Sequence, residues 1–251
     1  ALLASEGAPE PVRALTFRTP LVKEDEVRLA REVAERLGLD LHVEDIDVTL
    51  APGVLSNPPD RCFFCRKALH RAAKIHAEKS GLTLIADGLQ ADDLEENRPG
   101  ARAAAEDGII HPLAKAGLTK QELRELAREA GLPNSERPAA PCLATRFPPG
   151  VPISRALLGK IEKGEAFLAE EGFDNSRIRV FPPGLASLEI EREDLPRLWD
   201  VRERIVEALR GIGFSVVSLD LEGLERGKMG RFLEEVGGME EVWLVEASLD
   251  D

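Results

Sequence analysis

Three cysteines are the residues of this chain whose spacing most clearly indicates chemistry. Cys62 and Cys65 form a Cys-Phe-Phe-Cys motif at the start of a predicted helix, and Cys142 follows 77 residues after Cys65. Backbone N–H groups and the helix dipole are expected to favour thiolates at a helix start. The cysteines could be small buried side chains, or a dithiol with an unrelated third cysteine.

Two metal-bound interpretations stay open beside that one. Zinc would take the three cysteines and one histidine, which would be His70, His76 or His111. An iron–sulfur cluster would take the three thiolates and leave one iron without a protein ligand. An odd number of ligands suits a reactive cluster better than an electron carrier, because the open iron can bind a further ligand.

Arginines form a second group that could bind an anion. Arg177 and Arg179 share one face of a predicted strand, since side chains alternate along a strand. Two guanidinium groups side by side make a forked anion site, and Arg146 follows Cys142 by four residues. The alternative is that Arg177 and Arg179 are solvated on an edge strand.

Two glutamates occupy positions where a charged side chain is unexpected. Glu165 continues a helical stripe of Leu158, Ile161 and Leu168, so it occupies a position where an apolar residue is expected. Glu189 shares a face of its predicted strand with a serine two residues earlier. A carboxylate on a core-facing stripe needs a partner or a role at a cleft. The alternative for each is a boundary residue with its head in water.

Acidic residues follow the predicted strand at residues 82–86. Asp87 and Gly88 end this strand, and ligands bind at the carboxyl ends of strands in open α/β sheets. Asp92 and Asp93 could reach a Mg²⁺ ion held by a nucleotide. A solvated turn is the alternative, above all for Glu95 and Glu96. The chain contains no GxGxxG, Walker A or HExxH motif.

Strands and helices are predicted to alternate through two α/β domains. In residues 1–147, strands at 12–17, 41–47 and 82–86 alternate with helices, one at 23–37, one capped by Asp60, and one opened by the capping box of Thr119 and Glu122. Residues 148–152 are predicted as a linker. In residues 151–251, helices at 154–171 and 194–210 and strands at 177–181, 185–191 and 215–221 form a smaller α/β unit.

Composition narrows the class of protein. The chain has 251 residues, a formal charge of −13 and 31% charged residues, which is typical of a soluble globular protein. No apolar run is long enough for a membrane span, and no secretory leader opens the chain. Three cysteines exclude a disulfide scaffold and favour a cytoplasmic location. The negative charge argues against nucleic-acid binding.

Several motifs together resemble one family. The chain resembles the LarE family in three places. These are Asp87-Gly88 with Asp92-Asp93 and Asn97-Arg98-Pro99-Gly100, the segment from Cys142 through Arg146 to Gly150, and Arg177-Ile-Arg179-Val. The members of this family are ATP-dependent sulfur transferases that build the nickel-pincer nucleotide of lactate racemase. The similarity covers nearly the whole chain.

The resemblance implies a fold and a reaction. The fold is a parallel-sheet ATP-pyrophosphatase (PP-loop) domain, similar to adenine nucleotide alpha hydrolases, followed by a smaller α/β domain. The substrate is a pyridinium dicarboxylate mononucleotide, whose carboxylates are adenylated with ATP and Mg²⁺ and then converted to thiocarboxylates. A small-molecule sulfide or sulfur donor is expected as a further partner. Neither a nucleic acid nor a membrane is expected as a partner, and the protein is expected to be a homo-oligomer.

The resemblance also implies roles for particular residues. In single-cysteine members the residue matching Cys142 gives up its own sulfur, whereas members with the pattern of Cys62, Cys65 and Cys142 hold a [4Fe–4S] cluster that carries the transferred sulfur. The remaining roles are carried over in the same way. Arg146, Arg177, Arg179, Glu165 and Glu189 would bind the substrate, Asp92 and Asp93 would bind Mg²⁺, and Phe17, Arg18, Asp87 and Gly88 would bind ATP.

One family motif is absent from the printed sequence. The phosphate loop of the Ser-Gly-Gly-x-Asp-Ser type should lie between a first strand and a first helix, and residues 1–6 are predicted as the end of that helix. We therefore expect the loop to precede Ala1. Two other functions stay open, which are a cluster-dependent tRNA thiolase and a non-catalytic nucleotide-binding protein stapled by zinc.

Overall fold

The computed structural model describes residues 2–7, 12–95, 99–138, 140–181, 184–225 and 227–229. It divides into two compact units, which we describe separately. The first unit holds Ala1–Thr145 and Gly150–Glu162, and the second holds Arg146–Pro149 and Lys163–Asp251. Glu96, Asn97 and Arg98, which the sequence analysis singled out, lie outside the described residues.

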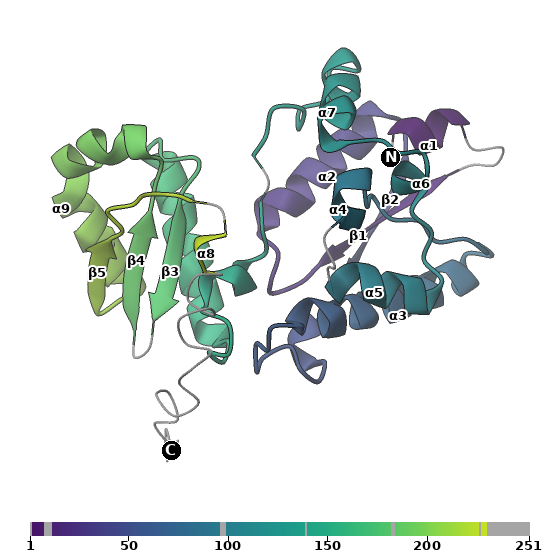
Figure 1. Ribbon diagram of the computed structural model, residues 1–251. Helices are drawn as coiled ribbons and strands as arrows, with labels where there is room; N and C mark the ends of the chain where they lie inside the picture. The colour runs from purple at the N-terminus through teal and green to yellow at the C-terminus, as the bar shows by residue number, and fades with distance from the viewer. Residues whose placement is uncertain are drawn as a thin grey trace. The chain divides into compact units, whose positions relative to one another are not determined.

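The first unit combines a parallel strand pair with helices (Figure 1). Its strands are β1 (Arg13–Arg18) and β2 (Asp40–Asp45). Its helices are α1 (Leu2–Gly7), α2 (Glu24–Arg36), α3 (Arg61–Lys79), α4 (Ala91–Glu95), α5 (Pro99–Asp107), α6 (Pro112–Lys115) and α7 (Lys120–Glu129), with short 3-10 turns at η1 (Val48–Leu50) and η2 (Leu143–Arg146). Helix α8 (Arg155–Glu170) begins in this unit and continues into the second.

The local sequence accounts for the helices of the first unit. β1 and β2 pair in parallel from Arg13–Asp40 to Arg18–Asp45, and α2 supplies the crossover that a parallel pair requires. The predicted helix at 23–37 is confirmed as α2. The predicted capping box is also confirmed, because the Thr119 side chain accepts from the Glu122 backbone and Glu122 bonds the Thr119 backbone in return.

Two predictions about the first unit are wrong. Residues 82–86 are not a buried strand, because their only pairing in the described chain is a single bridge from Ala86 to Ile110, and Leu84 is 72% exposed. A strand needs a ladder of neighbours, and one bridge does not provide it. Asp60 occupies the N-cap position of α3 but its side chain makes no capping hydrogen bond, since its backbone is not extended as at an ordinary N-cap.

The second unit is a three-stranded sheet with helices on it (Figure 1). Its strands are β3 (Arg177–Phe181), β4 (Leu185–Glu189) and β5 (Val216–Leu219), in the order β3-β4-β5, and its second helix is α9 (Leu195–Ile212), preceded by the 3-10 turn η3 (Arg192–Asp194). β3 and β4 are antiparallel, and β4 and β5 are parallel. The predicted helices and strands of this part of the chain are confirmed, with small shifts of their ends.

A glycine allows the close packing of the second unit. A Cβ atom on Gly164 of α8 would lie 2.5 Å from Cδ1 of Ile178 and 3.0 Å from Cδ2 of Leu209. Ile178 lies on β3 and Leu209 on α9, so both helices pack on the apolar face of the sheet. The opposite face of β3 therefore carries Arg177 and Arg179.

Both units mix helices with a sheet that contains parallel strands, so the predicted α/β class is confirmed. Across the described residues, every helix is too short or too polar to cross a lipid bilayer.

Candidate functional site

The three cysteines come from two segments of the first unit. Cys62 and Cys65 lie in the first turn of α3, with Cys62 exposed and Cys65 partly buried. Cys142 lies immediately before η2 and is also partly buried. None of the three is in a disulfide.

Hydrogen bonds join these two segments. Arg61, the first residue of α3, donates from Nη1 to the Ala144 carbonyl at 3.3 Å and from the same nitrogen to the Asn57 side chain. Asn57 in turn donates to the Val151 carbonyl at 2.9 Å and accepts from the Gly150 backbone at 2.8 Å. The start of α3 is therefore tied to the segment that follows Cys142.

The loop before α3 fits closely under the cysteine motif. Gly53 has φ +83°, and a Cβ atom there would lie 2.7 Å from the ring of Phe64. Phe64 stands between Cys62 and Cys65 in the sequence. Only glycine suits this position, because an L side chain would be strained and would collide with the ring.

Cys142 and Cys62 lie close enough to Cys65 for their charges to affect its pKa. Burial, together with the charges of Cys142 and Cys62, raises the pKa of Cys65 to about 11, against the lowering effect of Arg66 and Arg61. The expectation that the helix start favours a thiolate is therefore wrong for Cys65. This thiol keeps its proton at neutral pH unless a cation replaces that proton.

The histidines considered as zinc ligands have other neighbours. His70 Nδ1 lies 2.9 Å from an oxygen of Asp107, and His111 Nδ1 lies 2.6 Å from an oxygen of Asp87. His76 is eleven residues beyond Cys65 on the same helix, which is about 16 Å along the helix axis.

In the second unit, Glu165 is a buried partner of Arg146. Arg146 donates from Nε and Nη2 to the two Glu165 oxygens, each at 2.8 Å, and both side chains are at most 3% exposed. Glu165 also accepts the backbone N–H of Ile178 at 2.9 Å. Because β3 is an edge strand, this carboxylate covers an open N–H group of the sheet.

Arg179 and Glu189 form a second buried pair. Arg179 Nη2 lies 3.0 Å from a Glu189 oxygen, and Glu189 is 1% exposed. Lys228 Nζ approaches the other Glu189 oxygen at 3.5 Å and bonds Asp220. The interpretation of Arg179 as a solvated residue is therefore wrong, because the side chain is 4% exposed and faces a carboxylate on the next strand. Lys228 and Asp220 had no signal in the sequence.

Arg177 differs from its two neighbours. It is half-buried, and within the described residues its side chain makes no hydrogen bond or ion pair. Burial lowers the pKa of Arg177, and the positive charges of Arg179 and Arg146 lower it further. The arginine cluster (Arg146, Arg177 and Arg179) thus contains two neutralised cations and one cation that an incoming anion would stabilise.

The residues predicted to bind ATP lie in separate segments of the first unit. Phe17 and Arg18 end β1, and Arg18 forms ion pairs with Glu24 at 3.0 Å and Asp45 at 3.1 Å. Asp87 accepts from the Leu89 backbone at 3.1 Å as well as facing His111, and Gly88 is exposed.

The carboxylates predicted to bind Mg²⁺ contact backbone groups. Asp92 accepts from the Lys120 backbone N–H at 2.7 Å, and Asp93 accepts from the Gln90 backbone N–H at 3.3 Å. These contacts fix the ends of α4 and α7. Magnesium binding by these two residues stays a prediction.

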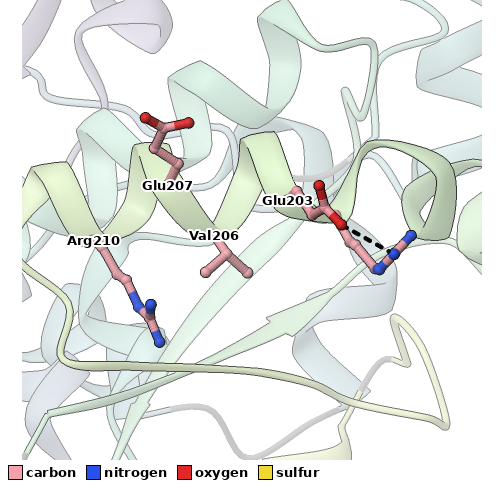
Figure 2. Close-up of a pocket in the computed structure, with 5 residues that line it drawn as sticks. Glu203, Val206, Glu207 and Arg210 are labelled. Atoms are coloured by element: carbon pink, nitrogen blue, oxygen red, sulfur yellow. Dashed lines mark hydrogen bonds and ion pairs between the residues drawn. The ribbon is translucent and has the colours of Figure 1, made fainter.

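A surface depression of ≈ 490 Å³ lies along α9 (Figure 2). Figure 2 shows Glu203, Val206, Glu207 and Arg210 spaced along one helix, and Arg202 pairs with Glu203 at 3.2 Å. None of the predicted site residues lines this depression. Its charged residues lie on the exposed face of α9, so we assign no function to this depression.

Comparison with known proteins found three relatives that span most of the chain. An uncharacterized protein of Synechocystis is 33% identical over 88% of this chain and 82% of its own length. An uncharacterized protein of Methanocaldococcus jannaschii is 33% identical over 82% and 78%. The pyridinium-3,5-bisthiocarboxylic acid mononucleotide synthase of Lactiplantibacillus plantarum is 28% identical over 87% and 79%. No family model matches the chain.

These findings define the class of the protein. An α/β chain with a relative of this coverage that is named for making a thiocarboxylate is a sulfur-transferring enzyme. The chain belongs to the LarE family, which its motifs had indicated.

Proposed function

We propose that this enzyme converts the carboxylates of a pyridinium dicarboxylate mononucleotide to thiocarboxylates, using ATP and a sulfur carrier bound by Cys62, Cys65 and Cys142. The observation that carries the proposal is that the two segments holding the cysteines are hydrogen-bonded to each other, with Cys62 and Cys142 near enough to Cys65 to affect its pKa. The name of the Lactiplantibacillus plantarum relative supports the substrate class.

The cysteines fit a [4Fe–4S] cluster held by three ligands. They form no disulfide, and the charges of Cys62 and Cys142 act against ionisation of Cys65. A cationic metal centre removes this repulsion, because it stabilises all three thiolates together. When bound, such a cluster would supply the sulfur that is transferred. The carboxylate partners of His70 and His111, and the distance of His76 from Cys65 along α3, weigh against zinc with a histidine ligand.

The arginine cluster fits the phosphate group of the mononucleotide. Arg177 supplies the cation that lacks a carboxylate, while Glu165 and Glu189 hold Arg146 and Arg179 in place. In this proposal Arg177 contacts the substrate, and the two glutamates are positioning residues. A guanidinium group can bind two phosphate oxygens at once, which orients the ligand as well as holding it.

ATP activates the substrate in this proposal. A carboxylate oxygen of the mononucleotide attacks the α-phosphorus of ATP and pyrophosphate leaves, which gives an acyl adenylate. Sulfide then attacks the acyl carbon, a C–S bond forms, the C–O bond to AMP breaks and AMP leaves, which gives the thiocarboxylate with no change of oxidation state. Several parts of this proposal remain predictions. They are the binding of ATP near Asp87, Gly88, Phe17 and Arg18, the requirement for Mg²⁺, the external sulfide donor, the homo-oligomer and the cytoplasmic location.

Turnover of the mononucleotide tests the proposed function. The protein, reconstituted anaerobically with iron and sulfide, is incubated with ATP, Mg²⁺ and pyridinium-3,5-dicarboxylic acid mononucleotide, and thiocarboxylate products are measured by mass spectrometry. We expect product from the wild type and none from Cys142→Ala. Product formation by Cys142→Ala at the wild-type rate would contradict the assigned role of this residue.

Substrate binding tests the role of the arginine cluster. Arg177→Ala is expected to weaken binding of the mononucleotide by ~1.5–3 kcal/mol, the range for a hydrogen bond to a charged group. Arg210→Ala is the matched control, because Arg210 is an exposed arginine of α9 in the same unit. An unchanged Kd for Arg177→Ala would show that the phosphate is bound elsewhere.

A further inference from the structure

A second group of potential metal ligands lies apart from the cysteines. Ligand atoms of His42, Glu44 and His76 all lie within 4.8 Å of one another, and this is the one such group of three among the described residues. His42 and Glu44 are two residues apart on β2, so their side chains leave the strand on the same side. His76 reaches them from α3.

The three side chains face one another without hydrogen bonds. The rings of His42 and His76 stack with their centroids 4.4 Å apart and an interplanar angle of 27°. His76 Nδ1 lies 3.7 Å from a Glu44 oxygen, which is too long for a hydrogen bond. Within the part of the chain that the structure describes, neither imidazole makes a side-chain hydrogen bond.

The other two histidines of the chain provide the contrast. His70 and His111 each place Nδ1 against a carboxylate, at 2.9 Å and 2.6 Å. These two rings are oriented by their partners. The rings of His42 and His76 leave their nitrogen atoms available to a ligand that can bind both of them and the Glu44 carboxylate together.

The set of ligand atoms selects a class of cation. Two imidazole nitrogens and one carboxylate oxygen suit zinc and similar divalent transition metals, whereas Mg²⁺ and Ca²⁺ prefer oxygen ligands throughout. Tetrahedral ligands of zinc lie about 3.4 Å from one another. Their present spacing is within 4.8 Å, so the stacked rings would rotate to bring the three groups to that distance on binding an ion.

We propose that His42, Glu44 and His76 bind a divalent transition-metal ion of the zinc class. His42 is exposed, so at least one further coordination position is open to water. The ion would join β2 to α3 and would stabilise the folded state, because a ligand that binds only the folded chain raises its stability. The site does not depend on the proposed function, since His76 is about 16 Å along α3 from Cys65.

Metal titration tests this site. Because thiols also bind zinc, the background is a full-length variant in which Cys62, Cys65 and Cys142 are replaced by alanine. We expect one Co²⁺ or Zn²⁺ ion per chain, with no thiolate-to-cobalt absorption band and a higher Tm in the presence of metal. Adding His76→Ala should weaken binding at least about tenfold and abolish the rise in Tm.

Two further variants keep the test decisive. His42→Ala removes an exposed ligand without disturbing the core, so it replaces His76→Ala if that variant unfolds, and it is expected to weaken binding to the same degree. His111→Ala is the control and should bind metal normally. Absence of binding in the cysteine-free background, or equal binding after removal of His42, would overturn the proposal.

Discussion

Replacing Glu165 by alanine is expected to destabilise the second unit strongly. The carboxylate accepts two hydrogen bonds from Arg146 and one from the Ile178 backbone, at distances between 2.8 and 2.9 Å. Both side chains of the ion pair are at most 3% exposed. Glu165→Ala therefore leaves a buried guanidinium without this carboxylate and a strand N–H without its acceptor.

The size of the effect follows from the burial of the pair. Removing one partner of a buried ion pair costs about 3–5 kcal/mol, because the remaining charge loses its compensation. We expect a loss of about 4 kcal/mol in the free energy of unfolding, roughly a thousandfold in the equilibrium constant. Replacing Arg146 and Glu165 together by apolar residues of similar size should restore much of this loss, since the desolvation cost of both charges disappears.

The assay must report on the second unit by itself. Native-state hydrogen exchange of the β3 and β4 amides measures the stability of this sheet, because these amides exchange through its opening. Glu170→Ala is the matched control, as Glu170 is an exposed residue of the same helix and should change stability by no more than about 0.5 kcal/mol. A loss below about 1 kcal/mol for Glu165→Ala would refute the reasoning.

Three further predictions concern single residues. Thr119→Ala removes the capping box of α7 and should cost about 1 kcal/mol, measured by urea denaturation. Gly164→Ala forces a Cβ atom to within 2.5 Å of Ile178 and should cost about 1–3 kcal/mol in the same measurement. Because the pKa of Cys65 is raised from 9.0 to about 11, the folded chain keeps a proton that the unfolded chain has lost, so stability should fall as pH rises from about 9 to about 11 and Cys65→Ala should remove this fall.

Periodicity and capping residues predicted the longer helices, because these signals are local, but they did not predict α4, α5 or α6. The stripe of Leu158, Ile161 and Leu168 predicted α8, and the Thr119 box predicted the start of α7. The same kind of signal failed for residues 82–86, since an apolar run becomes a strand only where other strands pair with it.

The sequence predicted which residues belong to the candidate site, but it did not predict which of them form pairs. Glu165 stood out because it broke an apolar stripe, yet only the structure shows that Arg146 neutralises it. His42 and Glu44 are two residues apart in a predicted strand, which is a signal for a shared face, but His76 is 32 residues further along the chain than Glu44. Contacts between distant segments depend on tertiary packing, which local sequence patterns do not reveal.

The most direct test of the central claim is the iron and acid-labile sulfide content after anaerobic reconstitution. We expect about four iron and about four sulfide per chain in the wild type, and their loss in Cys62→Ala. Zinc in place of iron, or full iron content in Cys62→Ala, would contradict the assignment of Cys62, Cys65 and Cys142 as the ligands of a sulfur-carrying cluster.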